Sequence, residues 1–320
     1  MKRKYGLFFI ADIIILIFLL LASSTDIFVN EKEGEVYNIC VFTDCYKDGH
    51  IDNFRLGVDK ASSAYNIDLN FIYLNEYEKI NEKLNMVTRE VENGCQGVLL
   101  ACGDDRTEEE ILDTISKSSI PVVLYNGTSE NSAAKGTVGP NLEAEAELIV
   151  SNIKKNLPVN ERIYIFEYEN SSEYTKNLHV FIEQKLIECG FSYEKITVEY
   201  KDDIHSEMDK IIRHNLGSIV SADSRALENI GEECDYYNYD VFVCGAGWSG
   251  IIRNYIEKDI IKFTVAHTAY EAGYSAMGKI ICSIENRAYD KINEINVKSV
   301  VVNNENLYSD DIEPVIFPYS

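Results

Sequence analysis

Short runs of β-branched and apolar residues alternate with amphipathic stretches along most of this chain, and this alternation limits the possible folds more than any other feature. The short runs are typical of buried strands, and the stretches between them repeat apolar residues at helical spacing. Phe54, Val58, Ala61 and Tyr65 are one such repeat. Strands that alternate with helices predict parallel sheets with helices on both faces.

The alternation can be divided into two halves. In the first half, strands are expected at 36–42, 68–74, 97–101, 122–125 and near 137–138. In the second half, strands are expected at 162–167, 196–200, 218–221, 240–244, 263–266 and 299–302. Helices are expected at 54–65, 80–91, 173–189, 206–215, 250–258 and 268–284, with another beginning at a capping box of Thr107 and Glu110.

The expected fold class is therefore α/β, with two doubly wound parallel-sheet lobes joined by a three-crossing hinge. Lobe I comprises residues 36–139 plus 268–298, and lobe II comprises 140–267 plus 299–320. Ligands of such sheets bind beyond the carboxyl ends of the strands, so the space between the lobes is the expected site.

Within residues 1–24, an apolar run from Gly6 to Ala22 is broken only by Asp12 and is preceded by the basic residues Lys2, Arg3 and Lys4. It is long enough for a transmembrane helix and is expected to act as an N-terminal signal anchor. A signal peptide cut near Ser24 is the alternative, because Ala22 and Ser24 are small enough for a cleavage site. Residues 25–35 are interpreted as a linker. The anchor would hold the remaining chain on the extracytoplasmic face of the cell membrane, and cleavage near Ser24 would release it as a secreted protein.

The composition of the chain excludes one class of partner. A formal net charge of −23 gives a surface that repels phosphate backbones, and no cluster of basic residues outside the N-terminus offsets it. We therefore expect no nucleic acid partner.

Eight cysteines would suit a disulfide framework, yet several lie inside apolar strands, as Cys40 and Cys244 do. Small core residues are the preferred interpretation of these thiols.

Several segments, taken in order, resemble the type I periplasmic solute-binding proteins, specifically the sugar-binding group related to ribose-binding protein. Residues 48–61 resemble the first helix of that family, 94–101 its third strand, and 120–126 its fourth strand. Residues 138–144 resemble the passage into the second lobe.

The resemblance continues through the second half and covers nearly all of 37–319. Residues 222–227 resemble the family's Asn-Asp-x-x-Ala segment, and 243–247 resemble its Gly-Phe-Asp strand end. His267 and Gly273 fit the last hinge crossing. The resemblance implies a protein that closes on a small polar ligand, by family a carbohydrate, without altering it.

Three positions depart from the family pattern. Ala101, Ala222 and Gly247 stand where relatives carry side chains that form hydrogen bonds. A buried sugar hydroxyl without a partner costs about 1 to 3 kcal/mol. The departures therefore put a common monosaccharide ligand in question.

Other motifs favour no catalytic chemistry. Gly245 to Gly250 follows the G-x-G-x-x-G pattern, but Glu271, the candidate acidic partner, is expected on a helix rather than at a strand end. The five histidines share no metal-ligand spacing. We expect no enzyme activity, no metal and no cofactor.

Ten residues at the predicted edges of the two lobes are the candidates for ligand binding, each with a loop or capping role as the alternative. They are Asp44, Tyr46, His50, Asp104 and Asn126 from lobe I, and Tyr174, Asn177, Asp223, Trp248 and His267 from lobe II. Asp223 could serve only to cap the helix that follows it. Trp248 could stack on a sugar ring.

The expected partners are an ABC permease or a sensor histidine kinase, with an uncleaved anchor favouring the kinase. A degenerate binding module that acts through a protein partner is one alternative, and a nicotinamide-dependent oxidoreductase is another. A repressor of the related family is disfavoured, because an apolar span occupies the place of a DNA-reading helix pair.

Overall fold

The computed structural model describes residues 35–43, 50–74, 79–101, 105–127, 133–213, 217–286 and 293–317. The expected membrane anchor or signal peptide lies outside these ranges. Within them, we find no helix with the length and apolar character that crossing a bilayer requires. Residues from Tyr37 onward form one compact unit, to which all the elements below belong.

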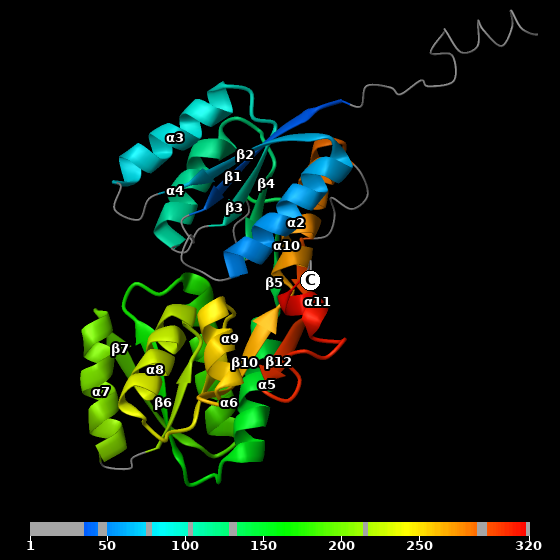
Figure 1. Cartoon of the computed structure of the whole chain (residues 1–320). Coiled ribbons are helices and arrows are strands. Elements are labelled where there is room, and N and C mark those ends of the chain that lie inside the picture. The colour runs from blue at the N-terminus through cyan, green and yellow to red at the C-terminus, as the bar shows by residue number, and fades with distance from the viewer. Residues whose placement is uncertain are drawn as a thin grey trace, which may run out of the picture. The chain divides into compact units, whose positions relative to one another are not determined.

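Two six-stranded sheets organise this unit (Figure 1). Sheet A has the order β11-β5-β4-β3-β1-β2, and all of its pairs are parallel. Its strands are β1 (Tyr37–Thr43), β2 (Ile67–Tyr73), β3 (Gly97–Ala101), β4 (Val122–Tyr125), β5 (Gly136–Pro140) and β11 (Glu294–Val297).

Sheet B has the order β12-β10-β9-β8-β6-β7. Its pairs are parallel except for β10 with β12, which is antiparallel at the edge. Its strands are β6 (Arg162–Tyr168), β7 (Ser192–Val198), β8 (Ser218–Ser221), β9 (Val243–Ala246), β10 (Ile261–His267) and β12 (Ser299–Asn303).

Helices cover both faces of each sheet, which confirms the predicted α/β architecture with two parallel-sheet lobes. On sheet A, α2 and α10 pack on one face, and α3 and α4 on the other (Figure 1). On sheet B, α5 and α6 pack on one face, and α7, α8 and α9 on the other. The helices are α2 (His50–Tyr65), α3 (Ile80–Glu92), α4 (Asp105–Ser116), α5 (Leu142–Asn156), α6 (Glu173–Glu188), α7 (Lys201–Arg213), α8 (Ser224–Tyr237), α9 (Gly250–Glu257), α10 (Ala269–Ile284) and the short α11 (Glu313–Ile316).

Strand β1 shows why its residues form a central strand. Ile39 and Val41 enter the apolar core under α2 and α10, whereas Cys40 and Phe42 enter the core under α3 and α4. Successive side chains of a strand point to opposite faces, so a strand covered on both sides must be apolar at every position.

The chain passes between the two sheets three times. It leaves sheet A after β5, returns from β10 through α10, and leaves again from β11 to β12. These passages bring the last residues of β10 close to the last residues of β4.

Several element boundaries differ from the predictions. The capping box at Thr107 is wrong, because α4 begins at Asp105 and Thr107 lies inside it. Helix α7 begins at Lys201, and β9 begins only at Val243. The sequence patterns also missed β11, which is an exposed edge strand with a polar sequence, and α5.

The cysteines in the described part of the chain are free, as expected for core thiols. They are Cys40, Cys95, Cys189, Cys234, Cys244 and Cys282, and four of them are buried.

Helices α2 and α10 approach closely through two glycines. A Cβ atom at Gly57 would lie 2.0 Å from the carbonyl oxygen of Tyr270, and one at Gly273 would lie 2.2 Å from that of Phe54. Both distances are below any real contact, so a side chain at either position would force the helices apart.

We therefore expect Gly57→Ala and Gly273→Ala each to lower the free energy of unfolding by roughly 1 to 3 kcal/mol, as overpacking does. Gly250→Ala is the matched control, because no atom lies within 4 Å of a Cβ at this helix start. The Gly250→Ala substitution should leave the free energy of unfolding unchanged or raise it slightly. Urea unfolding followed by circular dichroism measures the difference, and equal losses in all three variants would contradict the argument.

Candidate functional site

The seven predicted site residues that the structure describes follow the carboxyl ends of strands. His50 begins α2 after β1, and Asn126 follows β4. Asp44, Tyr46 and Asp104 lie outside the described residues. The others lie at the sheet B edge: Tyr174 and Asn177 on α6, Asp223 before α8, Trp248 after β9, and His267 at the end of β10.

His267 is the centre of a polar group, which we call the histidine cluster: the buried His50, Tyr125, Glu145 and His267 and the half-buried Tyr174 and Ser299. The Tyr125 hydroxyl lies 2.9 Å from His267 Nε2. The His50 ring stacks on the His267 ring with centroids 4.1 Å apart and an interplanar angle of 13°. Because His50 and Tyr125 belong to elements of sheet A and His267 to sheet B, the cluster joins the two lobes.

Glu145 supplies a buried carboxylate to this cluster. Its side chain is 0% exposed and accepts hydrogen bonds from the Ser299 hydroxyl at 2.7 Å and the Tyr174 hydroxyl at 2.5 Å. Oε1 also lies 3.6 Å from His267 Nδ1. A proton on Nδ1 would face this carboxylate and leave Nε2 to accept from Tyr125.

Sequence reasoning found His50, Tyr174 and His267 but missed Tyr125, Glu145 and Ser299. One signal for Glu145 was present in the sequence. On α5 it lies in line with Ile149, Val150 and Ile153, the buried apolar face of the helix. A carboxylate on such a face needs partners from elsewhere in the fold.

Burial sets the protonation of the cluster. Burial lowers the pKa of His50 well below its usual range, and the nearby imidazole of His267 lowers that pKa further. His50 is therefore neutral at physiological pH, which suits a ring stacked on a second imidazole.

Asp223 serves as a helix cap in this structure. Its carboxylate accepts from the backbone N–H groups of Arg225 and Ala226, from the Ser171 hydroxyl and from the Arg225 guanidinium. The guanidinium lies over the Tyr168 ring, 5.1 Å from its centroid. Asp223 therefore caps α8 in this structure, and its role in ligand binding remains a prediction.

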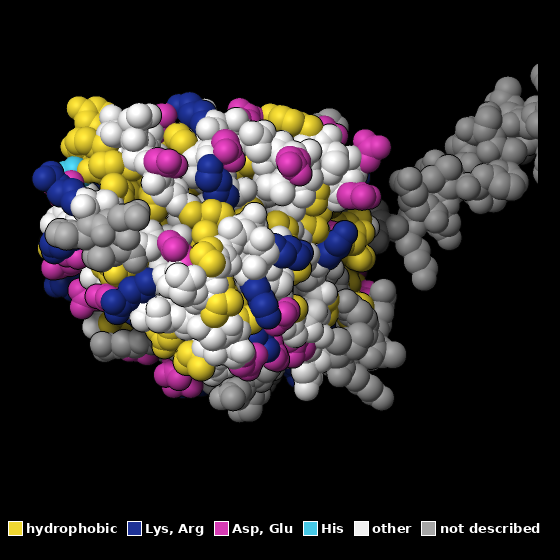
Figure 2. Space-filling model, turned by 90° about the horizontal axis from the view of Figure 1, so that it is seen from below, with side chains coloured by type: hydrophobic (Ala, Val, Ile, Leu, Met, Phe, Trp, Pro, Cys, Tyr) yellow, Lys and Arg dark blue, Asp and Glu magenta, His cyan; other side chains and the backbone are white. Residues whose placement is uncertain are grey.

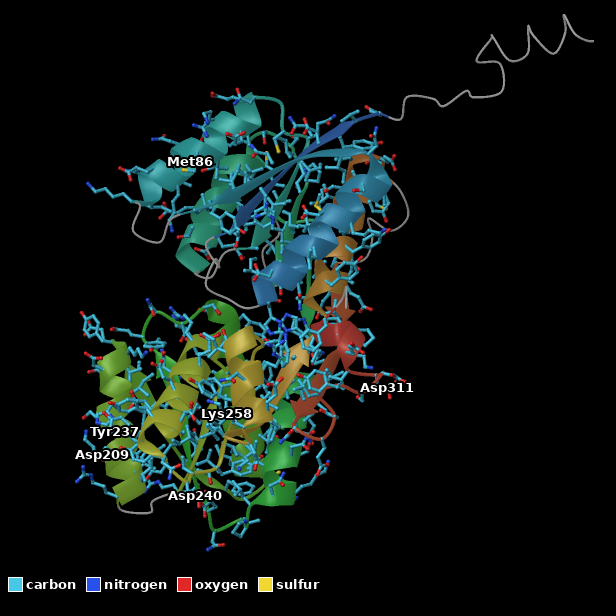
Figure 3. All side chains as sticks on the ribbon, viewed as in Figure 1. Met86, Asp209, Tyr237, Asp240, Lys258 and Asp311 are labelled. Atoms are coloured by element: carbon cyan, nitrogen blue, oxygen red, sulfur yellow. The ribbon has the colours of Figure 1, made fainter. Side chains whose placement is uncertain are left out.

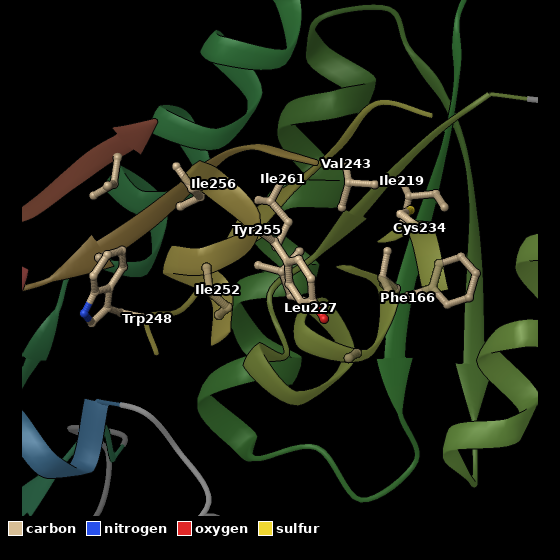
Figure 4. Close-up of a cluster of buried hydrophobic side chains, with 14 of the residues drawn as sticks. Phe166, Ile219, Leu227, Cys234, Val243, Trp248, Ile252, Tyr255, Ile256 and Ile261 are labelled. Atoms are coloured by element: carbon tan, nitrogen blue, oxygen red, sulfur yellow. The ribbon is translucent and has the colours of Figure 1, made fainter. Parts of the chain in front are cut away.

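Trp248 is 5% exposed and belongs to the apolar core of sheet B, where it lies beside Ile252 (Figure 4). Phe317 meets it edge to face with centroids 5.8 Å apart. The indole thus packs against the chain's own C-terminal segment. Its role in stacking on a ligand remains a prediction.

Asn126 has a left-handed backbone with φ of 58°. Its Oδ1 atom is buried without a hydrogen-bond partner and lies 2.7 Å from the position of a Cβ at Gly139. A side chain at Gly139 would displace this amide. Asn177 is half-buried on α6 and is not part of the histidine cluster.

A second histidine forms a separate buried network under the sheet B edge. His179 Nε2 accepts from the backbone N–H of Ala222 at 2.9 Å, and Nδ1 lies 2.8 Å from Glu167 Oε2. Since Nε2 is the acceptor, Nδ1 carries the proton and donates to Glu167. Lys195 also pairs with Glu167 at 3.0 Å. This network fixes the loop before α8.

No group of three or more potential metal ligands gathers among the residues with described positions. What the histidine cluster offers is hydrogen bonding and flat ring surfaces.

The pKa of His50 leads to a stability prediction. Below about pH 6.5, the usual histidine value, the unfolded chain takes up a proton at His50 that the folded chain resists. The free energy of unfolding should therefore fall on acidification by up to about 1.4 kcal/mol per pH unit. His50→Gln should flatten this slope between about pH 7 and pH 5, as urea midpoints would show. Identical slopes in both proteins would contradict the assignment.

Solved structures of similar fold cover most of the chain. A candidate LacI transcriptional regulator from Bacteroides fragilis is 14% identical with a TM-score of 0.76, over 85% of this chain and 98% of its own. An ABC transporter solute-binding protein from Agrobacterium vitis, solved with α-D-tagatopyranose, is 11% identical with a TM-score of 0.76, over 88% and 99%. GanP, a glucose-galactose binding protein from Geobacillus stearothermophilus, is 15% identical with a TM-score of 0.73, over 86% and 99%.

At these identities the structures establish the fold alone. Among curated proteins, none matches this sequence significantly. A family model, described as the periplasmic binding protein domain, matches residues 39–279. That match includes most strands of both sheets and covers more than half of the chain, and the chain therefore belongs to the periplasmic binding protein family.

Proposed function

We propose that this chain is an extracytoplasmic solute-binding protein whose lobes close on a small polar ligand, a carbohydrate, without altering it. One observation supports this most: elements of both sheets contribute polar and aromatic side chains to one cluster at the carboxyl ends of β4 and β10. In parallel-sheet proteins, ligands bind at these ends. Two solved solute-binding proteins of similar fold are complexes with D-arabinose and with D-fucose.

The chemistry of the cluster suits an uncharged, hydroxyl-rich ligand. Its buried groups are hydroxyls, an amide nearby at Asn126, neutral His50 and a carboxylate already paired with protein donors. Flat rings cover the faces of sugars, and short polar side chains fix their hydroxyls. An ionic ligand would bring an unpaired charge into this buried setting.

Two departures from the family pattern have structural causes. Gly247 has a φ of +119°, and a Cβ there would lie 2.7 Å from the side chain of Ser224. Ala222 is 4% exposed and its N–H is held by His179. Sugar hydroxyls must therefore find partners at other positions, and the ten predicted residues remain our candidates for them.

The proposed partner is an ABC permease or a sensor histidine kinase, which would recognise the closed form. Membrane tethering through residues 1–24, or secretion after cleavage, would place the domain where such partners act. On the face drawn in Figure 2, basic side chains lie among acidic ones rather than in one basic patch.

The oxidoreductase alternative has little support in the fold. Glu271 lies in the first turn of α10, which packs on sheet A, whereas the turn at Gly245 belongs to sheet B. The dinucleotide motif needs its acidic residue at the end of a neighbouring strand. A Cβ at Gly245 would lie 1.7 Å from the Ser221 carbonyl oxygen, so close strand packing explains this glycine.

Thermal unfolding of the full chain with pentoses, hexoses and polyols tests the proposal. A sugar present at about 100 times its Kd adds about 2.7 kcal/mol to the free energy of unfolding. This increase should raise the Tm by several degrees. No shift with any sugar, nucleoside or amino acid would favour the degenerate module, and a shift with nicotinamide nucleotides would favour the oxidoreductase.

With a binding sugar in hand, Tyr125→Phe tests the cluster itself. The variant keeps the ring that stacks on Phe54, with centroids 4.1 Å apart, and removes the hydroxyl near His267. We expect affinity to fall by roughly tenfold, as the loss of one hydrogen bond implies. Tyr193→Phe is the matched control, because its hydroxyl donates to Glu183 at 2.9 Å away from the cluster. Calorimetry should show wild-type affinity for the control. An equal loss of affinity in both variants would show that the histidine cluster is not part of the binding site.

A further inference from the structure

The chain beyond β12 folds back onto sheet B. Leu307, Ile312 and Val315 are buried in the apolar core that α9 also covers, and α11 packs against β10. Asp311, labelled in Figure 3, marks the exposed side of this segment. We call residues 307–317 the C-terminal strap. Its buried side chains fix it to lobe II.

Phe317 of the strap lies within a set of ring and charge contacts. Its ring meets Trp248 edge to face with centroids 5.8 Å apart, and it is parallel to the Tyr308 ring at 6.4 Å. The Arg253 guanidinium of α9 lies 5.8 Å from the Phe317 centroid. Glu257 of α9 accepts a hydrogen bond from the Tyr308 hydroxyl. Ring pairs and cation–π contacts are attractive, so α9 holds Phe317 against the indole.

One polar atom of this set is not satisfied. Arg253 Nε is buried and has no hydrogen-bond partner among the described residues. The carboxylate of Glu257 lies 3.7 Å away, which is too far for a hydrogen bond. A buried donor without a partner costs free energy. This cost weakens the hold on Phe317 and favours a contact that a ligand can displace.

The strap also contacts lobe I. Asn53 Nδ2 donates to the Ile316 carbonyl oxygen at 3.2 Å. Asn53 lies in the first turn of α2, and this helix begins at His50 of the histidine cluster. Because Ile316 directly precedes Phe317, the hold on α2 and the contact with the indole are adjacent on the strap. A displacement of Phe317 therefore acts on both lobes.

Trp248 connects the strap to the expected binding site. It lies just beyond the carboxyl end of β9, where ligands of parallel sheets bind. Its side chain is only 5% exposed, with Phe317 packed against it. A sugar that stacks on the indole needs surface of this side chain, so the sugar and Phe317 compete for it.

We propose that the C-terminal strap is autoinhibitory. Phe317 covers Trp248, and Ile316 holds α2, until a sugar bound between the lobes takes the place of Phe317 on the indole. This inference rests on the proposed function, because it assigns a competitor to the proposed sugar. The apparent affinity for the sugar is reduced to the fraction of molecules in which the strap is displaced. Loss of the Phe317 ring therefore strengthens sugar binding, whereas loss of a ring that contacts the sugar weakens it.

Phe317→Ala tests the strap in the full chain. Calorimetric titration with D-arabinose, D-fucose and D-galactose should give a Kd several-fold lower for the variant than for the natural chain. Trp248 is the only tryptophan of the chain, so its fluorescence reports on the strap. Without sugar, the variant's emission should shift to longer wavelength and be quenched more strongly by acrylamide. Asn53→Ala removes the hold on α2 and should also lower the Kd.

Phe71→Ala is the matched control. Phe71 is also half-buried beneath a guanidinium, that of Arg55 at 4.9 Å, but it lies on β2 of lobe I. It should leave both the Kd and the emission unchanged. An unchanged or higher Kd in Phe317→Ala, or in Asn53→Ala where Phe317→Ala does not fold, would overturn the autoinhibitory strap and leave the proposed function standing. If none of the three sugars bound to the natural chain or to either variant, the proposed function and the strap would both be wrong.

Discussion

The buried carboxylate of Glu145 is the constraint on which the junction of the two sheets depends. A carboxylate that is 0% exposed must be paired, or it costs several kcal/mol. Its donors come from α6 through Tyr174 and from β12 through Ser299, and His267 of β10 lies beside it. Helix α5, which carries Glu145, and strands β10 and β12 each border a passage of the chain between the sheets, so the carboxylate finds its partners only when the passages are correctly assembled.

His267 extends this constraint to sheet A. Its ring nitrogen lies at hydrogen-bonding distance from Tyr125, and its face stacks on His50. Tyr125 in turn stacks on Phe54 of α2. A carboxylate buried in one lobe thus organises a continuous set of contacts that ends in the helix core of the other. Buried networks of this kind stabilise when every member is satisfied and destabilise strongly when one is not.

The sequence predicted the strands with uniform apolar runs most accurately. The residues of β3 and β4 agree with the predicted ranges, because burial on both faces leaves a nearly unbroken apolar signal. Strand β11 left no such signal, since its residues alternate between exposed and half-buried at the edge of sheet A. The start of α4 was misplaced because Thr107 and Glu110 fit a capping box that the backbone does not use there. Sequence patterns reflect interactions between residues that are close in sequence, whereas β11 and the start of α4 depend on contacts with residues far away in sequence.

The site was predictable in position but only partly in membership. Strand ends identified His50 and His267, because parallel topology alone brings such ends to one edge. Asp223 was identified for the same reason. Its hydrogen bond from the Ser171 hydroxyl, which helps to use its carboxylate within the protein, could not be predicted because Ser171 is far away in sequence. Glu145 could not be assigned a role without the fold, because its partners lie on α6, β10 and β12.

The same contacts bear on how readily the lobes can move. Separation of the sheets must break the His50 stack, the Tyr125 contact with His267 and the hydrogen bond from Asn53 Nδ2 to the Ile316 carbonyl oxygen, which measures 3.2 Å. Each contributes on the order of 1 kcal/mol. Their sum is well below the roughly 8 kcal/mol of a ligand with micromolar affinity. Contacts of this strength can hold the lobes together without a ligand, yet a ligand that prefers another arrangement has ample free energy to shift the balance.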